Sequence, residues 1–125
     1  MLKNEKGFTL IEIIAVLVIL GILAAVAVPR YLSLMDQSRI AAAQGAIGEL
    51  KSRASNIYAK LYLSGNGADP GETTVQDSIS TDVGSDFSGI TLGNSGSNIT
   101  FTITTVKGST LSTGATGTWY YPIQS

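Results

Sequence analysis

The sequence contains neither cysteine nor histidine. Without cysteine there are no disulfide bonds and no thiolate metal sites, and the redox environment of the chain cannot be inferred. The joint absence excludes nucleophilic pairs of serine or cysteine with histidine, and it excludes histidine-rich zinc or iron sites. Any catalytic chemistry would therefore have to rest on carboxylates alone.

Charge is also scarce. The formal net charge is −1, so no basic surface gathers phosphates and a nucleic-acid partner is not predicted. The stretch from Ser64 to Gly89 carries acids but no lysine or arginine, which predicts a solvated acidic surface. Asp77, Asp82 and Asp86 could instead bind calcium, whose usual ligands are loop carboxylates, although no recognised ligand spacing is present.

Hydrophobic residues are concentrated in the first half of the chain. The 125 residues suffice for one small domain. Leu, Ile, Val and Ala dominate residues 1–63, whereas Gly, Ser, Thr and Asn dominate residues 64–125. We therefore predict an α+β fold, with a helical first half followed by loops and strands.

The first 28 residues combine a polar start with a long apolar run. Residues 1–7 include Lys3 and Lys6, and the run from Phe8 to Val28 contains one charged residue, Glu12. As a helix this run would span roughly 30 Å, the thickness of the hydrocarbon core of a bilayer. The lysines before it predict a cytoplasmic N-terminus and an exported remainder.

Residues 29–63 have the period of an amphipathic helix. Gly65 to Gly67 should end this helix, because glycine and asparagine are common just beyond a helix C-terminus. Joined to the apolar run, it predicts one helix over residues 8–63, of about 55 residues and on the order of 80 Å. Its apolar stripe consists of Ala43, Ile47, Leu50, Ala54, Ile57 and Leu61.

The second half predicts a small antiparallel sheet that packs on the outer half of the helix. Residues 64–89 should form a connection with at most short structure. Strands are predicted at Ile90 to Leu92 and, from strict alternation, at Asn98 to Val106. A further strand carries the alternating Trp119, Tyr121 and Ile123, and the linkers between strands are Gly93 to Ser97 and Gly108 to Gly117.

The motif GFTLIE, at Gly7 to Glu12, follows a short basic leader and opens the apolar run. In this setting it resembles the processing signal of the type IV pilins. The resemblance implies a type IV pilin-like fold, cleavage between Gly7 and Phe8 by prepilin peptidase, and methylation of the new Phe8 amino group by the same enzyme. The implied parts are a leader (1–7), a membrane and filament-core segment (8–28), an amphipathic helix half (29–63) and a head (64–125).

Glu12 is a carboxylate within an apolar segment, which costs several kcal/mol unless it is paired and marks a functional candidate. Alternatively, it lies shallowly in the stored subunit and reaches the headgroup region. The resemblance implies that in the filament Glu12 pairs with the Phe8 amino group of a neighbouring subunit and so fixes the axial register.

The helix should be less stable between Gly21 and Pro29. Glycine in a helix costs about 1 kcal/mol relative to alanine, and proline lacks an amide donor. We expect a kink near Pro29, and the resemblance implies loss of helical order between these residues on assembly. The alternative is a gently bent continuous helix. Residues Pro29 to Lys60 resemble the mannose-sensitive haemagglutinin pilins, but the head lacks the cysteine pair of many major pilins.

The resemblance implies a non-enzymatic subunit, without cofactor, that polymerises with itself into an extracellular type IV pilus. Its expected partners are prepilin peptidase, the pilus assembly machinery and, before assembly, the inner membrane. One alternative is a pseudopilin of a type II secretion system. Another is an exported soluble domain cleaved near Val28, after Ala25-Val26-Ala27.

Overall fold

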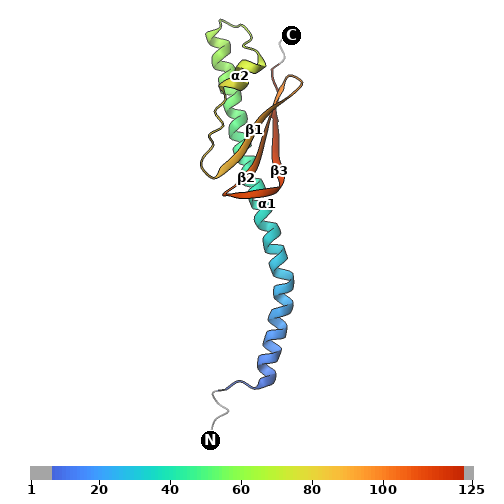
Figure 1. Cartoon of the computed structure of the whole chain (residues 1–125). Helices are drawn as coiled ribbons and strands as arrows, with labels where there is room; N and C mark the ends of the chain where they lie inside the picture. Colours follow the sequence, from blue (N-terminus) through green and yellow to red (C-terminus); the bar gives the residue numbers. More distant parts are fainter. Residues whose placement is uncertain (1–6, 123–125) are drawn as a thin grey trace. The chain divides into compact units, whose positions relative to one another are not determined.

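The computed structural model describes residues 7–122, which form two helices and three strands. The chain divides into two compact units, Met1–Met35 and Asp36–Ser125. The α+β class is confirmed, with a long helix and a three-stranded antiparallel sheet packed against it. The elements are α1 (Leu10–Ser64), α2 (Glu72–Ser78), β1 (Phe87–Ser95), β2 (Asn98–Val106) and β3 (Ser109–Trp119) (Figure 1).

Helix α1 contains 55 residues and begins two residues after Phe8, where the sequence predicted its start. It runs without interruption through Gly21 and Pro29. Every residue from Gly7 to Leu34 is exposed. The predicted loss of helical order on assembly concerns the filament and stays a prediction.

In the second unit, α1 buries a stripe made mainly of small residues, which lets the sheet approach closely. The buried residues are Ala43, Ala46, Ile47, Leu50 and Ala54, while Ile57 and Leu61 are partly buried against the same core. The predicted stripe is thus confirmed, with Ala46 as an addition.

The helix ends at Ser64 through a glycine-based cap, as the sequence predicted. The Gly65 amide donates to the Leu61 carbonyl and the Gly67 amide donates to the Tyr62 carbonyl, both at 2.9 Å. Asn66 and Gly67 adopt φ values of 55° and 87°, which glycine and asparagine tolerate best. Beyond this cap, α2 is short and buries Val75 in the core.

The sheet has the order β1-β2-β3, and Figure 1 shows it lying along the second half of α1. The bounds of β2 agree with the prediction, and its Ile99, Phe101 and Ile103 are fully buried. The prediction for β1 was too short, because β1 extends over Phe87–Ser95 and includes part of the predicted linker.

The prediction for the third strand was wrong. The segment predicted as a linker, Gly108 to Gly117, is largely β3, and β3 ends at Trp119, where the predicted strand began. The buried residues of β3 lie four apart, with Thr113 and Gly117 between them, so the sequence shows no apolar alternation with a period of two. The buried residues of β3 are Leu111, Ala115 and Trp119, and the predicted strand residue Ile123 lies outside the described residues.

Gly117 explains how β3 can lie so close to α1. A Cβ atom at this position would lie 2.4 Å from Cγ2 of Ile47 and 2.9 Å from Cε of Lys51. Real Cβ atoms do not approach other carbons this closely, so a side chain here would push strand and helix apart.

Candidate functional site: the N-terminal segment of the helix

Thr9 and Glu12 cap the N-terminus of α1 reciprocally. The Thr9 amide donates to Oε2 of Glu12 at 2.9 Å, and the Glu12 amide donates to Oγ1 of Thr9 at 3.2 Å. This is a capping box, in which a threonine and a glutamate three residues later satisfy two amides that the helix leaves unpaired. The T-x-x-E spacing is a local signal in the sequence, but the capping box was not predicted from it.

The capping box gives Glu12 a local partner within the subunit. Its carboxylate lies beside the first amides of α1, where the helix dipole favours negative charge. The Glu12 carboxylate is thus held at the beginning of the helix, beside Thr9, which follows Phe8 in the sequence.

Gly7 and Phe8 precede the helix and lie outside any regular element. Phe8 is 80% exposed, and a Cβ atom built on Gly7 would meet nothing within 4 Å. Both residues are thus exposed in the described part of the chain. The predicted leader falls on residues 1–7, of which only Gly7 is described.

The exposed part of α1 presents large apolar side chains in every direction. Among the described residues, this is the one helix long and apolar enough to cross a membrane. Monomeric soluble proteins rarely expose contiguous apolar patches beyond a few hundred Å². The apolar segment, as we call it, includes Phe8, Leu10, Ile11, Ile13, Ile14, Val16, Leu17, Val18, Ile19, Leu20, Ile22, Leu23, Val26, Val28, Tyr31, Leu32 and Leu34.

The acidic residues of the head do not form a metal centre in the described part of the chain. No group of three or more His, Cys, Asp or Glu side chains gathers there in a way that could hold a metal ion. Asp82, one of the calcium candidates, instead accepts the Gly84 amide through Oδ1 at 3.1 Å. It shapes its own loop.

An aromatic cluster in the second unit was not predicted as a group. Its members are Tyr58, Tyr62, Trp119 and Tyr121. The Tyr58 ring contacts each of the other three, and Trp119 also contacts Tyr121, with ring centroids 5.4 to 6.2 Å apart. Nε1 of Trp119 donates to Oγ of Ser55 at 2.9 Å. The cluster therefore fastens the end of β3 to the helix.

Tyr121 extends this fastening beyond β3. Its hydroxyl donates to the Asp69 carboxylate, and its amide donates to Oδ1 of Asn98 at 3.1 Å. Burial, and then the hydrogen bond to Asp69, raise the pKa of Tyr121 well above its ordinary value.

Comparison with known proteins matches part of the chain. Residues 2–28 fit the model of the prokaryotic N-terminal methylation motif. The chain is 53% identical over 45 residues to type II secretion system core protein G of Pseudomonas aeruginosa, covering 36% of this chain and 32% of that protein. It is 40% identical over 55 residues to a fimbrial protein of the same species, covering 44% and 36%.

A third relative is the type IV major fimbrial protein FimA of Dichelobacter nodosus, which is 40% identical over 48 residues, covering 38% of this chain and 31% of that protein. The matches thus span about a third of the length of these relatives. No solved structure matches the chain.

Proposed function

Because this chain belongs to the type IV pilin family, we propose that it is a structural subunit of an extracellular type IV pilus filament. The family resemblance seen in Gly7 to Glu12 is thereby confirmed. The narrower resemblance to the mannose-sensitive haemagglutinin pilins stays a prediction.

The observation that carries this proposal is the exposure of the apolar segment, which has no counterpart in the head. Such a surface is unstable in water and must be covered. Lipid covers it in the stored precursor, since the helix is long and apolar enough to span a membrane. Neighbouring copies of the same segment cover it in the filament, and a head-to-tail contact that does not close produces a helical polymer.

Processing prepares the subunit for this contact. Prepilin peptidase would cut between Gly7 and Phe8 and methylate the Phe8 amino group. The absence of a side chain at Gly7, and the position of both residues before the helix, support access by the protease.

Glu12 would then set the axial register by pairing with the Phe8 amino group of a neighbouring subunit. The capping box supports this role because it holds the Glu12 carboxylate at the beginning of the helix. A buried ion pair of this kind specifies geometry more than it adds net stability.

The proposed partners follow from this cycle. They are other copies of the chain, prepilin peptidase, the pilus assembly machinery and the inner membrane before assembly. The proposed location changes from the inner membrane, with the N-terminus cytoplasmic and the head outside, to the cell surface. The subunit itself is proposed to be non-enzymatic.

The second candidate is a pseudopilin, and the relative named type II secretion system core protein G favours it. Both candidates require processing and burial of the apolar segment between subunits. They differ in where the polymer ends. A pseudopilus would stay in the cell envelope, whereas a pilus would reach the cell surface.

The test is the intact mass and N-terminal residue of the chain, measured both in the cell envelope and in material sheared from the cell surface. The proposal expects methylated Phe8 as the first residue and abundant chain in the sheared fraction. The same terminus confined to the envelope would establish the pseudopilin. A chain that starts near Val28 would overturn both in favour of the exported soluble domain.

A further inference from the structure

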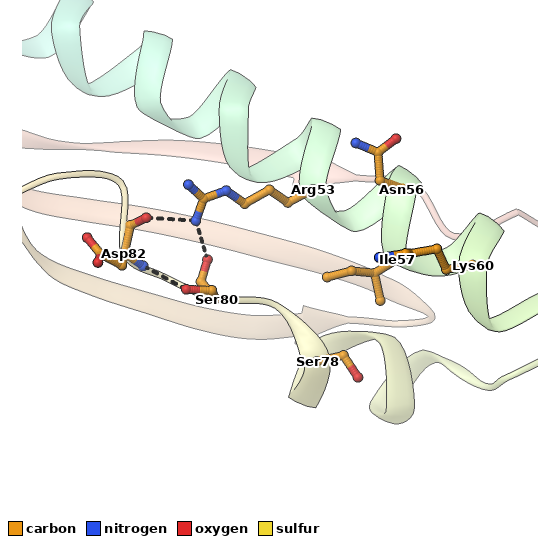
Figure 2. Close-up of a pocket in the computed structure, with 7 residues that line it drawn as sticks. All are labelled: Arg53, Asn56, Ile57, Lys60, Ser78, Ser80 and Asp82. Carbon is orange, nitrogen blue, oxygen red and sulfur yellow. Dashed lines mark hydrogen bonds between the residues drawn. The ribbon is translucent and has the colours of Figure 1, made fainter.

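A hollow in the second unit lies between the outer part of α1 and the end of α2 with the segment that follows it. Its volume is about 410 Å³, within the range of roughly 300–1,000 Å³ typical of small-molecule sites. Figure 2 shows the helix residues above the hollow and the loop residues below it. The lining residues are Arg53, Asn56, Ile57, Lys60, Ser78, Ser80 and Asp82.

The loop wall of this hollow is held in place by Arg53. Its Nη1 donates to the Ser80 carbonyl at 2.9 Å and to the Asp82 carbonyl at 2.7 Å, while Nη2 pairs with Glu49. These bonds fix two loop carbonyls to a rigid helix, and the dashed lines in Figure 2 trace them. The wall is therefore preformed, which lowers the ordering cost of binding.

Three acceptor groups around the hollow already accept hydrogen bonds from the protein. The carbonyls of Ser80 and Asp82 accept from Arg53, and the Asp82 carboxylate accepts the Gly84 amide. In Figure 2 that carboxylate points away from α1. The charge of Arg53 is balanced by Glu49.

Two side chains that can donate hydrogen bonds also line the hollow. Within residues 7–122, neither the Lys60 side chain nor the Asn56 side chain has a hydrogen bond or an ion pair. They are one helical turn apart, so their side chains share a face. The Ser80 hydroxyl accepts the Asp82 amide at 3.4 Å and keeps its own proton to donate. Ile57 adds an apolar surface between these donors.

We propose that this hollow binds a small ligand that carries both an anionic carboxylate and hydroxyl groups, the chemistry of an acidic sugar. Lys60 would pair with the carboxylate in a charge-assisted hydrogen bond. Asn56 and Ser80 would donate to hydroxyl oxygens, and Ile57 would contact the apolar edge of the ring. This site goes beyond filament assembly, and all of its residues lie in the second unit.

Titration calorimetry of the full chain in detergent micelles tests the proposal, with sodium glucuronate as the probe. Glucose and inorganic phosphate are the matched probes that lack the charge and the ring, respectively. We expect saturable binding of glucuronate that is at least tenfold tighter than that of either control and that weakens as salt is added. Absence of saturable glucuronate binding, or equally tight phosphate binding, would overturn the proposal.

Two variants assign the binding to the hollow. Lys60→Ala should weaken glucuronate binding at least tenfold, because it removes the cation. Lys107→Ala should leave it unchanged, since Lys107 lies in the exposed turn after β2 and does not line the hollow. Equal loss in both variants, or loss in neither, would contradict the assignment. Binding in micelles needs no filament, so it can fail or succeed independently of the proposed function.

Discussion

The two halves of α1 bury their hydrophobic residues in different ways. In the second unit, small residues such as Ala43 and Ala54 are fully buried by the sheet of the same chain. In the first, large residues such as Leu17 and Leu23 are about 60% exposed in the part of the chain that the structure describes. One helix thus relies on intramolecular packing at one end and, in the proposed function, on lipid or other subunits at the other. Substitutions in the two halves should therefore affect different properties.

The largest effect is expected for Gly7→Ala, which adds a side chain at the proposed cleavage bond. The variant should remain an uncleaved membrane precursor and form no filaments, while the head keeps its stability because Gly7 lies far from the core in sequence and outside the second unit. Intact mass gives the cleavage state. Normal filaments built from uncleaved Gly7→Ala chains would refute the processing mechanism.

Glu12→Ala should permit cleavage but impair assembly strongly. This variant removes both the charge and the cap of α1, so Glu12→Gln is the informative control: glutamine keeps the capping box but carries no charge. If pairing with the Phe8 amino group sets the register, both variants should yield few sheared filaments. Normal assembly of Glu12→Gln would mean that the cap, and not the ion pair, is what assembly requires.

Phe101→Ala should destabilise the head by about 3–5 kcal/mol, because it removes the largest fully buried side chain of the core. Leu17→Ala is the matched variant in the apolar segment and should leave the head unchanged. Denaturant unfolding of the full chain in micelles, followed by Trp119 fluorescence, compares them. Equal destabilisation by both would contradict the separation of the two halves.

Gly117→Ala should cost about 1–3 kcal/mol, since its methyl group would overlap Ile47. The control is Thr116→Ala, which changes an exposed neighbour in β3. The same unfolding assay applies. Unchanged stability of Gly117→Ala would contradict the close packing of β3 on α1.

The smallest effect concerns Tyr121 and appears only at high pH. Its pKa is raised in the folded chain, whereas in the unfolded chain it ionises near its ordinary value of about 10. The unfolded state therefore loses its proton first, and the stabilisation from this group, complete below pH 10, declines as the pH rises above that value. Tyr121→Phe should show a shallower loss of stability above pH 10. An identical pH profile would contradict this linkage.

The sequence was sufficient to predict an element wherever apolar residues recur regularly along one of its faces. The stripe on α1 and the alternation in β2 each reflect burial on one side, and both elements were located to within two residues. The end of α1 was also predictable, because Gly65 to Gly67 combine residues that tolerate positive φ.

Other features depend on pairing between distant segments. The strand β3 was missed because its buried residues lie four apart, with Thr113 and Gly117 between them. Its pairing with β2 joins two segments whose register the sequence pattern does not show. Gly117 was predicted to be a loop residue, and only the structure shows that Ile47 lies beside it. The roles of Arg53 and Tyr121 likewise rest on contacts made far along the chain. The capping box was the exception, since its T-x-x-E spacing is local.

Thiol labelling of sheared filaments tests most directly whether the apolar segment forms the filament core. The chain has no cysteine, so Leu17→Cys and Thr113→Cys each introduce a single reactive group, in the apolar segment and on the exposed surface of β3. A water-soluble maleimide should label Thr113→Cys in intact filaments but label Leu17→Cys only after the filaments are dissociated. Equal labelling of both positions in intact filaments would contradict the account.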